Sequence, residues 1–264
     1  MRTSPPATLS LRSVLPRWLM ACLLTSCVIS SAMAADSDPH PVIKRKLNLP
    51  PSAELHYNIE AQQSGLQVTG EALVKWNNAD NKYSVTAETR AMLLGKILEA
   101  SSEGDIDSYG LAPLHFVDKR FRKEPTTTSF NRELKTIEFT QSSQSYPLLG
   151  GEQDRTSIIW QLIAVARGNS DKFTPNSEWL FFVAGPRDAE QWRFKVVGRE
   201  KIKTAHGEIN AVHVLRAPPA QDQGQKLDIW LAPASEWYPV RLRFTDPNGD
   251  FIEQNLDKLS KPGH

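Results

Sequence analysis

The chain has 264 residues and carries 31 Lys and Arg against 30 Asp and Glu, which gives a formal net charge of +1. This balance lacks the clustered excess of cations that is typical of nucleic-acid-binding proteins, so we expect no nucleic-acid partner. The length suits one large domain or two small ones.

The first 34 residues are typical of a secretory signal peptide. They contain three arginines and no acidic residue, then an apolar run over 18–29 and a small-residue A-x-A site that ends at Ala34. The apolar run is too short to span a bilayer, as in signal peptides. We therefore predict cleavage after Ala34 and export of the remaining chain to the periplasm.

The same segment contains an alternative processing site. Residues 24–27, Leu-Thr-Ser-Cys, have the form of a bacterial lipobox, in which Cys27 would be acylated and would anchor a lipoprotein to a membrane. The apolar run continues past Cys27, and cleavage after Ala34 uses all of it, so we favour the soluble product. Both cysteines precede Ala34, so the exported chain would form no internal disulfide. No later apolar run approaches the ~18 residues of a transmembrane helix.

After the signal we predict a flexible linker over 35–50, a single β-rich domain over 51–258 and a C-terminal tail over 259–264. The linker contains several prolines and a basic triplet and lacks apolar periodicity. Within the domain apolar and polar residues alternate from position 55 onward, which is the pattern of strands with one solvated face.

About a dozen short strands joined by Gly, Pro and Asn turns favour an antiparallel meander. So many strands in one mainly β domain curl into a barrel or half-barrel, because closure removes exposed edges. Residues 91–98 also fit a helical turn, and we expect a strand from 97 to 106 there. The other strands are predicted near 55–61, 66–76, 83–87, 114–122, 126–130, 134–140, 179–183, 192–202, 208–216, 226–231, 240–244 and 251–256.

One segment has the helical period. Residues 155–167 follow Asp154, the expected N-cap, and precede Gly168, which we expect just past the C-terminal end. Within 158–166 only Gln161 is polar, so this helix is apolar nearly all round and should be buried. We interpret it as a plug or lid of the barrel, and an interaction helix is the alternative.

The sequence contains no catalytic motif such as G-x-S-x-G, H-E-x-x-H, a Walker loop or G-x-G-x-x-G. Its histidines are scattered, with no two within five positions, whereas zinc sites usually have close ligand pairs. We therefore predict no catalytic residue, no metal site and no cofactor. The histidines are His40, His56, His115, His206, His213 and His264.

Two local clusters have simpler interpretations than catalysis or binding. Asp154, Ser157 and a distant histidine would make a triad, but Asp154 is better explained as the helix cap, with Ser157 as its partner. Residues 185–188, Gly-Pro-Arg-Asp, could form an anion-binding loop, but we interpret them as a turn between two strands.

Residues 118–123, Asp-Lys-Arg-Phe-Arg-Lys, place four cations around one aromatic residue. Alternation along a strand puts Lys119 and Lys123 on one face and Arg120 and Arg122 on the other, so a continuous basic patch requires an edge strand. Edge lysines discourage strand addition, which is our preferred interpretation. Contact with anionic lipid headgroups of the envelope is the alternative.

The last predicted hairpin turns at 247–249, Pro-Asn-Gly. A two-residue Asn-Gly turn would set Phe244 against Glu253. A three-residue loop sets Phe244 against Ile252 and Arg243 against Glu253, which pairs apolar with apolar and opposite charges with each other. The glycine also suits the left-handed position of such a loop. We therefore predict the three-residue loop.

Several blocks of sequence together resemble the exported bacterial domain-of-unknown-function family DUF3108. The resemblance covers nearly the whole chain after the signal and implies an exported, strand-rich domain. It implies no established activity and no catalytic residues. The blocks are 49–55, 153–155, 184–192, 207–211, 227–233 and 239–242.

We therefore hypothesise a non-enzymatic periplasmic scaffold or apolar-ligand-binding protein that serves the cell envelope. The export signal, the barrel-like pattern and the lack of catalytic motifs support it, and barrel mouths favour apolar pockets. Expected partners are a lipid or another apolar ligand, or envelope proteins. The alternative is a periplasmic hydrolase whose carboxylates and histidines come together from separate strands.

Overall fold

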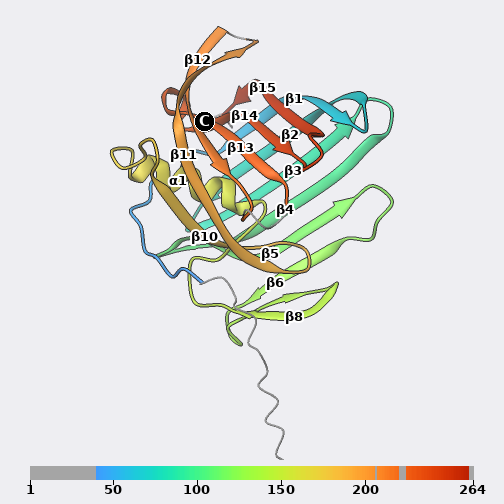
Figure 1. Ribbon diagram of the computed structural model, residues 1–264. Coiled ribbons are helices and arrows are strands. Elements are labelled where there is room, and N and C mark those ends of the chain that lie inside the picture. The colour runs from blue at the N-terminus through green and yellow to red at the C-terminus, as the bar shows by residue number, and fades with distance from the viewer. Residues whose placement is uncertain (1–39, 206, 220–223, 262–264) are drawn as a thin grey trace, which may run out of the picture. The chain divides into compact units, whose positions relative to one another are not determined.

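The computed structural model describes residues 40–205, 207–219 and 224–261. The signal segment, with its two proposed processing sites at Ala34 and Cys27, lies outside the described residues. Within them fifteen strands form one sheet in the order β8-β7-β6-β5-β4-β3-β2-β1-β15-β14-β13-β12-β11-β10-β9. The sheet curls around a single α-helix (Figure 1).

The predicted strands are all present, and the structure adds two, β8 and β9. The sequence gives little signal for either, because β8 is polar without alternation and β9 has only two residues. The elements are β1 Ala53–Gln63, β2 Leu66–Ala79, β3 Lys82–Ala91, β4 Gly95–Asp107, β5 Gly110–Arg120, β6 Thr126–Asn131, β7 Thr136–Phe139, β8 Ser142–Pro147, β9 Gln153–Asp154, α1 Ser157–Gly168, β10 Glu178–Ala184, β11 Ala189–Thr204, β12 Gly207–Arg216, β13 Lys226–Ala232, the 3₁₀ turn Pro233–Ser235, β14 Tyr238–Thr245 and β15 Phe251–Ser260.

The sheet is an open curl and not a closed barrel. Neighbouring strands are antiparallel except β9 and β10, which are parallel, and the edge strands β8 and β9 do not pair with each other. Side chains join the two arms of the curl away from β8: Gln153 Nε2 on β9 donates to Leu111 O on β5 at 2.7 Å, and Thr128 Oγ1 on β6 donates to Gly185 O after β10 at 2.8 Å. Because β9 ends after two residues, it offers no ladder long enough to complete a barrel.

The prediction of a buried helix is confirmed. α1 lies in the main core cluster with side chains of β1–β3 and β10–β14, and Leu162 is 0% exposed. The Trp160 ring stacks on Trp76 with centroids 4.5 Å apart. The single polar residue within 158–166, Gln161, pairs with backbone groups at the β4–β5 turn. The helix therefore plugs the concave face of the sheet. Among the described residues no helix is long and apolar enough to cross a bilayer.

The ends of α1 differ slightly from the prediction. Thr156, not Asp154, occupies the N-cap position, although the Asp154 carboxylate still accepts hydrogen bonds from the Thr156 and Ser157 N–H groups. At the other end Gly168 is the last helical residue and Asn169 caps it, with its side-chain amide donating to Val165 O at 2.8 Å.

Residues 40–50 of the predicted linker lie against the domain, which corrects the expectation of a free segment there. The Arg45 guanidinium donates to Leu180 O at 2.8 Å, and Asn48 N donates to Ala164 O at 3.0 Å. Gly168 allows this approach, because a Cβ there would lie 2.4 Å from the carbonyl oxygen of Lys46. The pairing of the linker with α1 was not visible in the sequence, since the two are more than a hundred residues apart.

The register of the last hairpin is the predicted one. Phe244 lies opposite Ile252, and Arg243 lies opposite Glu253 with a 3.0 Å ion pair between them. Gly249 has φ +87°, which places it in the left-handed region as the three-residue loop requires.

Candidate functional site

Three successive hairpins end on the same side of the sheet, on the right in Figure 1. They are the β1–β2, β3–β4 and β5–β6 hairpins. We call this side the rim and define it as residues 64–68, 90–99 and 119–124. The rim contains the basic segment noted in the sequence.

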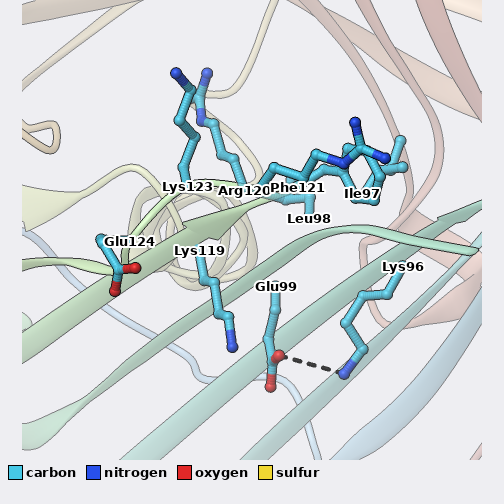
Figure 2. Close-up of a pocket in the computed structure, with 10 residues that line it drawn as sticks. Lys96, Ile97, Leu98, Glu99, Lys119, Arg120, Phe121, Lys123 and Glu124 are labelled. Atoms are coloured by element: carbon cyan, nitrogen blue, oxygen red, sulfur yellow. Dashed lines mark hydrogen bonds and ion pairs between the residues drawn. The ribbon is translucent and has the colours of Figure 1, made fainter. Parts of the chain in front are cut away.

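A pocket of about 410 Å³ lies in the rim where β5 separates from β6. The last β5–β6 pair is Asp118 with Thr126, so Lys119 and Arg120 pair with β4 alone and the end of β5 is locally an edge. Five of the residues around the pocket are cations and three are apolar. They are Lys96, Ile97, Leu98, Glu99, Lys119, Arg120, Phe121, Arg122, Lys123 and Glu124 (Figure 2).

The cations divide between two sides of the strands. Figure 2 shows Lys96 and Lys119 extending to one side and Arg120 and Lys123 to the other. The predicted alternation, with Lys123 on the face of Lys119, is wrong because the strand ends at Arg120 and Arg122 takes a left-handed conformation with φ +55°. The turn thereby brings Lys123 alongside Arg120, a juxtaposition that strand periodicity does not predict.

Part of this charge is neutralised within the protein. Lys96 Nζ lies 2.7 Å from Glu88 and 3.2 Å from Glu99, and these hydrogen bonds raise the pKa of Lys96. Arg120 Nε lies 3.1 Å from Asp118 Oδ1. In contrast, Lys119, Arg122 and Lys123 make no ion pair with any described residue, and the Arg122 guanidinium lies 4.8 Å from the Phe121 ring centroid. The pocket therefore offers unpaired cations beside apolar side chains, which suits an anionic group attached to an apolar chain.

The buried Asp154 was the other candidate, and the structure gives it a structural role. Its Oδ2 accepts a hydrogen bond from Ser102 Oγ at 2.5 Å, and Ser102 Oγ lies 2.9 Å from Tyr83 Oη. Burial raises the pKa of Asp154 to about 6, against the effect of hydrogen bonds from Ser102 and from the N–H groups of Ser157 and Thr156. No described histidine bonds to Asp154 or Ser157. These groups connect the helix to the sheet and do not form a triad.

The sequence analysis missed a cluster on β11–β13 in which one histidine, His213, contacts two carboxylates and a tryptophan. His213 Nδ1 lies 2.8 Å from Glu200 Oε1, its Nε2 lies 2.7 Å from Asp228 Oδ1, and its ring stacks on Trp230 at 4.5 Å. Burial alone would lower the pKa of His213, but the hydrogen bonds to Asp228 and Glu200 raise it above 6.5. Because both ring nitrogens are occupied, the imidazole has no free position for a substrate. In the described part of the chain no three His, Cys, Asp or Glu side chains gather as a metal site.

Residues 185–188 form the predicted turn between β10 and β11. Gly185 N donates to Asp188 O at 2.8 Å, which closes the turn. The Arg187 guanidinium points to Gln141, with Nη2 3.1 Å from Oε1.

The curled sheet with its helical plug defines a β-barrel-like protein. The solved structure of a β-barrel-like protein of family DUF1849 from Brucella abortus matches with a TM-score of 0.56 and 13% identity, over 84% of this chain and 100% of that chain. The chain belongs to the DUF3108 family, described as proteins of unknown function, whose model matches residues 52–257. The resemblance noted in the sequence is thus confirmed.

Two other solved structures match with lower TM-scores. A DUF1329 family protein from Desulfovibrio piger has a TM-score of 0.30 and 9% identity, over 80% of this chain and 86% of that chain. The lipoprotein LppX of Mycobacterium tuberculosis has a TM-score of 0.28 and 10% identity, over 80% of this chain and 88% of that chain. No curated protein matches the sequence.

Proposed function

We propose that this protein is a non-enzymatic binding protein of the bacterial envelope that holds an amphiphile with an anionic headgroup in the rim pocket. The observation that carries the proposal is the pocket at the paired ends of β4 and β5, where unpaired Lys119, Arg122 and Lys123 adjoin Leu98 and Phe121. Cations that lack a protein partner bind phosphate oxygens at low cost, because no internal ion pair must first be broken.

The rim is a better location for an apolar ligand than the interior of the curl. α1 fills the concave face, and Ile158, Leu162 and Ile163 are each 0% exposed. A ligand inside the curl would have to displace the helix together with the Trp76–Trp160 stack. The rim pocket is open to solvent and needs no such displacement.

Binding is favoured over hydrolysis by the state of the titratable groups in the described residues. Asp154 is used by hydrogen bonds that join α1 to the sheet, and His213 is held by two carboxylates. A general base needs a free lone pair within reach of a substrate, and neither group offers one in this arrangement.

The proposed function includes export, with cleavage after Ala34 releasing a periplasmic protein. Acylation of Cys27 is the alternative and would hold the same domain at a membrane surface. Either form presents the rim pocket in the envelope.

Titration with short-chain lipids tests the pocket directly. Dihexanoyl phosphatidylglycerol and dihexanoyl phosphatidylcholine, which share their acyl chains, are compared by calorimetry below their micellar concentrations. We expect tighter binding of the anionic lipid. The double variant Arg122→Gln, Lys123→Gln, which removes two of the unpaired cations, should weaken it by about 25-fold, at about fivefold for each cation removed.

Lys195→Gln is the matched control, since Lys195 is an exposed cation beside a second pocket of about 440 Å³. It should leave the titration unchanged. Equal affinity for both lipids, or an unchanged titration in the double variant, would refute the proposed pocket. Native mass spectrometry of protein purified from its own periplasm, followed by lipid extraction, then identifies the natural ligand.

A further inference from the structure

Large apolar side chains are exposed at the turns of the rim. Leu93 is 94% exposed, Met92 77% and Leu94 59% in the β3–β4 turn, and Leu66 is 69% exposed at the start of β2. Single exposed apolar residues are ordinary, but a group of them on one side of a sheet marks an interaction surface.

These turns belong to one continuous end of the sheet. Met92 N donates to Thr69 O at 3.1 Å, which joins the β3–β4 turn to β2, and Phe121 N donates to Ile97 O at 2.9 Å, which joins the β5–β6 turn to β4. The apolar tips therefore lie next to the cations of β4 and β5. The structure thus places apolar side chains and unpaired positive charge on the same side.

Charge also sets the limits of this surface. The β14–β15 turn beside the β1–β2 turn is acidic, and Asp250 Oδ2 accepts a hydrogen bond from Ser64 N at 2.8 Å. The cations lie at the other end of the rim, around Lys119, Arg122 and Lys123. The basic and apolar part therefore runs from β2 to the β5–β6 turn.

We infer that this part of the rim docks on an anionic phospholipid bilayer, with Met92, Leu93 and Leu94 inserted among the headgroups and the cations of 119–123 in contact with lipid phosphates. Apolar insertion together with electrostatic attraction is the usual basis of reversible binding to a membrane surface. The inference goes beyond the proposed function, because it concerns attachment of the whole domain to a bilayer and not the capture of a single amphiphile.

The charges favour a bilayer over a second copy of the chain as the occupant. In a two-fold contact the same patch meets itself, so Lys119, Arg122 and Lys123 of both copies would be brought into one interface. Like charges placed opposite one another in an interface oppose association. An anionic membrane complements them.

Vesicle cosedimentation of the chain beginning at Ala35 tests the inference. Phosphatidylcholine vesicles with and without phosphatidylglycerol are compared at low and high salt. We expect binding only to the anionic vesicles, weakened by salt, and at least tenfold weaker for Leu93→Asp. The matched control is Leu134→Asp, since Leu134 is 67% exposed in the β6–β7 turn at the opposite ends of the strands.

A second measurement reports insertion itself. Since the chain after Ala34 has no cysteine, Leu93→Cys and Leu134→Cys each give a unique site for an environment-sensitive fluorophore. The emission at position 93 should shift to the blue on addition of anionic vesicles, and that at position 134 should not. Absence of binding to anionic vesicles, equal binding of Leu93→Asp and Leu134→Asp, or a self-association that Leu93→Asp abolishes without any vesicle binding would each overturn the inference.

The two proposals fail separately. Leu93→Asp should weaken vesicle binding at least tenfold and leave the titration with dihexanoyl phosphatidylglycerol unchanged, because Leu93 does not line the pocket. A wild-type protein that binds vesicles but not the monomeric lipid would refute the pocket and keep the docking surface.

Discussion

Ser102 Oγ on β4 donates a hydrogen bond of 2.5 Å to Oδ2 of Asp154 on β9, and so connects two strands that are distant in the order of the sheet. The other carboxylate oxygen accepts the N–H groups of Thr156 and Ser157 at the start of α1. One buried carboxyl group thus fixes the helix to both sides of the open curl.

Asp154→Asn should change how stability depends on pH. Burial raises the pKa of Asp154 to about 6 in the folded protein, against about 4 in the unfolded chain. Between pH 4 and pH 6 the folded protein therefore keeps a proton on Asp154 that the unfolded chain has lost. This protonation stabilises the fold by about 3 kcal/mol below pH 4, and the stabilisation is lost as the pH rises to 6. Asparagine keeps an acceptor for the two N–H groups but does not titrate. The free energy of unfolding in urea should change less between pH 4 and pH 6 for Asp154→Asn than for the wild type. An equal change in both proteins would contradict the raised pKa of Asp154.

His213→Gln should change the pH dependence of stability in a higher pH range than Asp154→Asn does. The hydrogen bonds to Asp228 and Glu200 raise the pKa of His213 above 6.5 despite its burial. Its contribution to stability is therefore full below pH 6.5 and is lost as pH rises through the folded value. The variant should be less stable than the wild type at pH 6 and closer to it at pH 9. Asn58→Gln, an exchange of a non-titrating residue on the exposed face of β1, is the control, and its difference in stability from the wild type should be the same at both pH values.

Leu162→Asp should prevent folding or cost several kcal/mol, because the side chain is 0% exposed within the core and a charge there finds no partner. Leu162→Ala is a milder substitution whose unfolding can be measured, and we expect it to lower the free energy of unfolding by about 2–5 kcal/mol. Leu134→Ala in an exposed turn is the comparison. A loss below about 1 kcal/mol for Leu162→Asp in urea unfolding would show that α1 is peripheral.

Gln161→Leu should destabilise the protein although it replaces the only polar residue of an apolar helix segment. Gln161 accepts a hydrogen bond from Leu111 N at 2.9 Å and donates one to Tyr109 O at 2.7 Å. Leucine has no amide group, so the N–H of Leu111 and the carbonyl of Tyr109 lose their hydrogen-bond partner, at a cost of about 1–3 kcal/mol each. Gln67→Leu on the exposed part of β2 should have little effect. Equal thermal midpoints for the two variants would show that water replaces the side chain.

Intact mass spectrometry of the exported protein decides between the two processing sites. We expect an N-terminus at Ala35 and no lipid adduct, because cleavage after Ala34 uses the full apolar run of the signal. Cys27→Ser should then leave the product and its fractionation unchanged. A diacylated N-terminus at Cys27 would refute soluble release and establish a lipoprotein.

The sequence alone determined the features that depend on neighbouring residues. Alternation predicted the strands, the apolar segment 158–166 predicted a buried helix, and side-chain matching predicted Phe244 opposite Ile252. These succeed because strand period, helix period and turn chemistry are local properties, and a wrong register would place apolar side chains in water.

Only the tertiary structure decided what depends on distant residues. The contact of Ser102 with Asp154, the placement of His213 between Glu200 and Asp228, and the position of Lys123 beside Arg120 all follow from strand order and from where a strand ends. The sequence also did not decide between a closed barrel and an open sheet, since closure depends on the length of the edge strand β9. Local patterns fix which way a side chain faces, whereas its partners across the sheet are set by the global path of the chain.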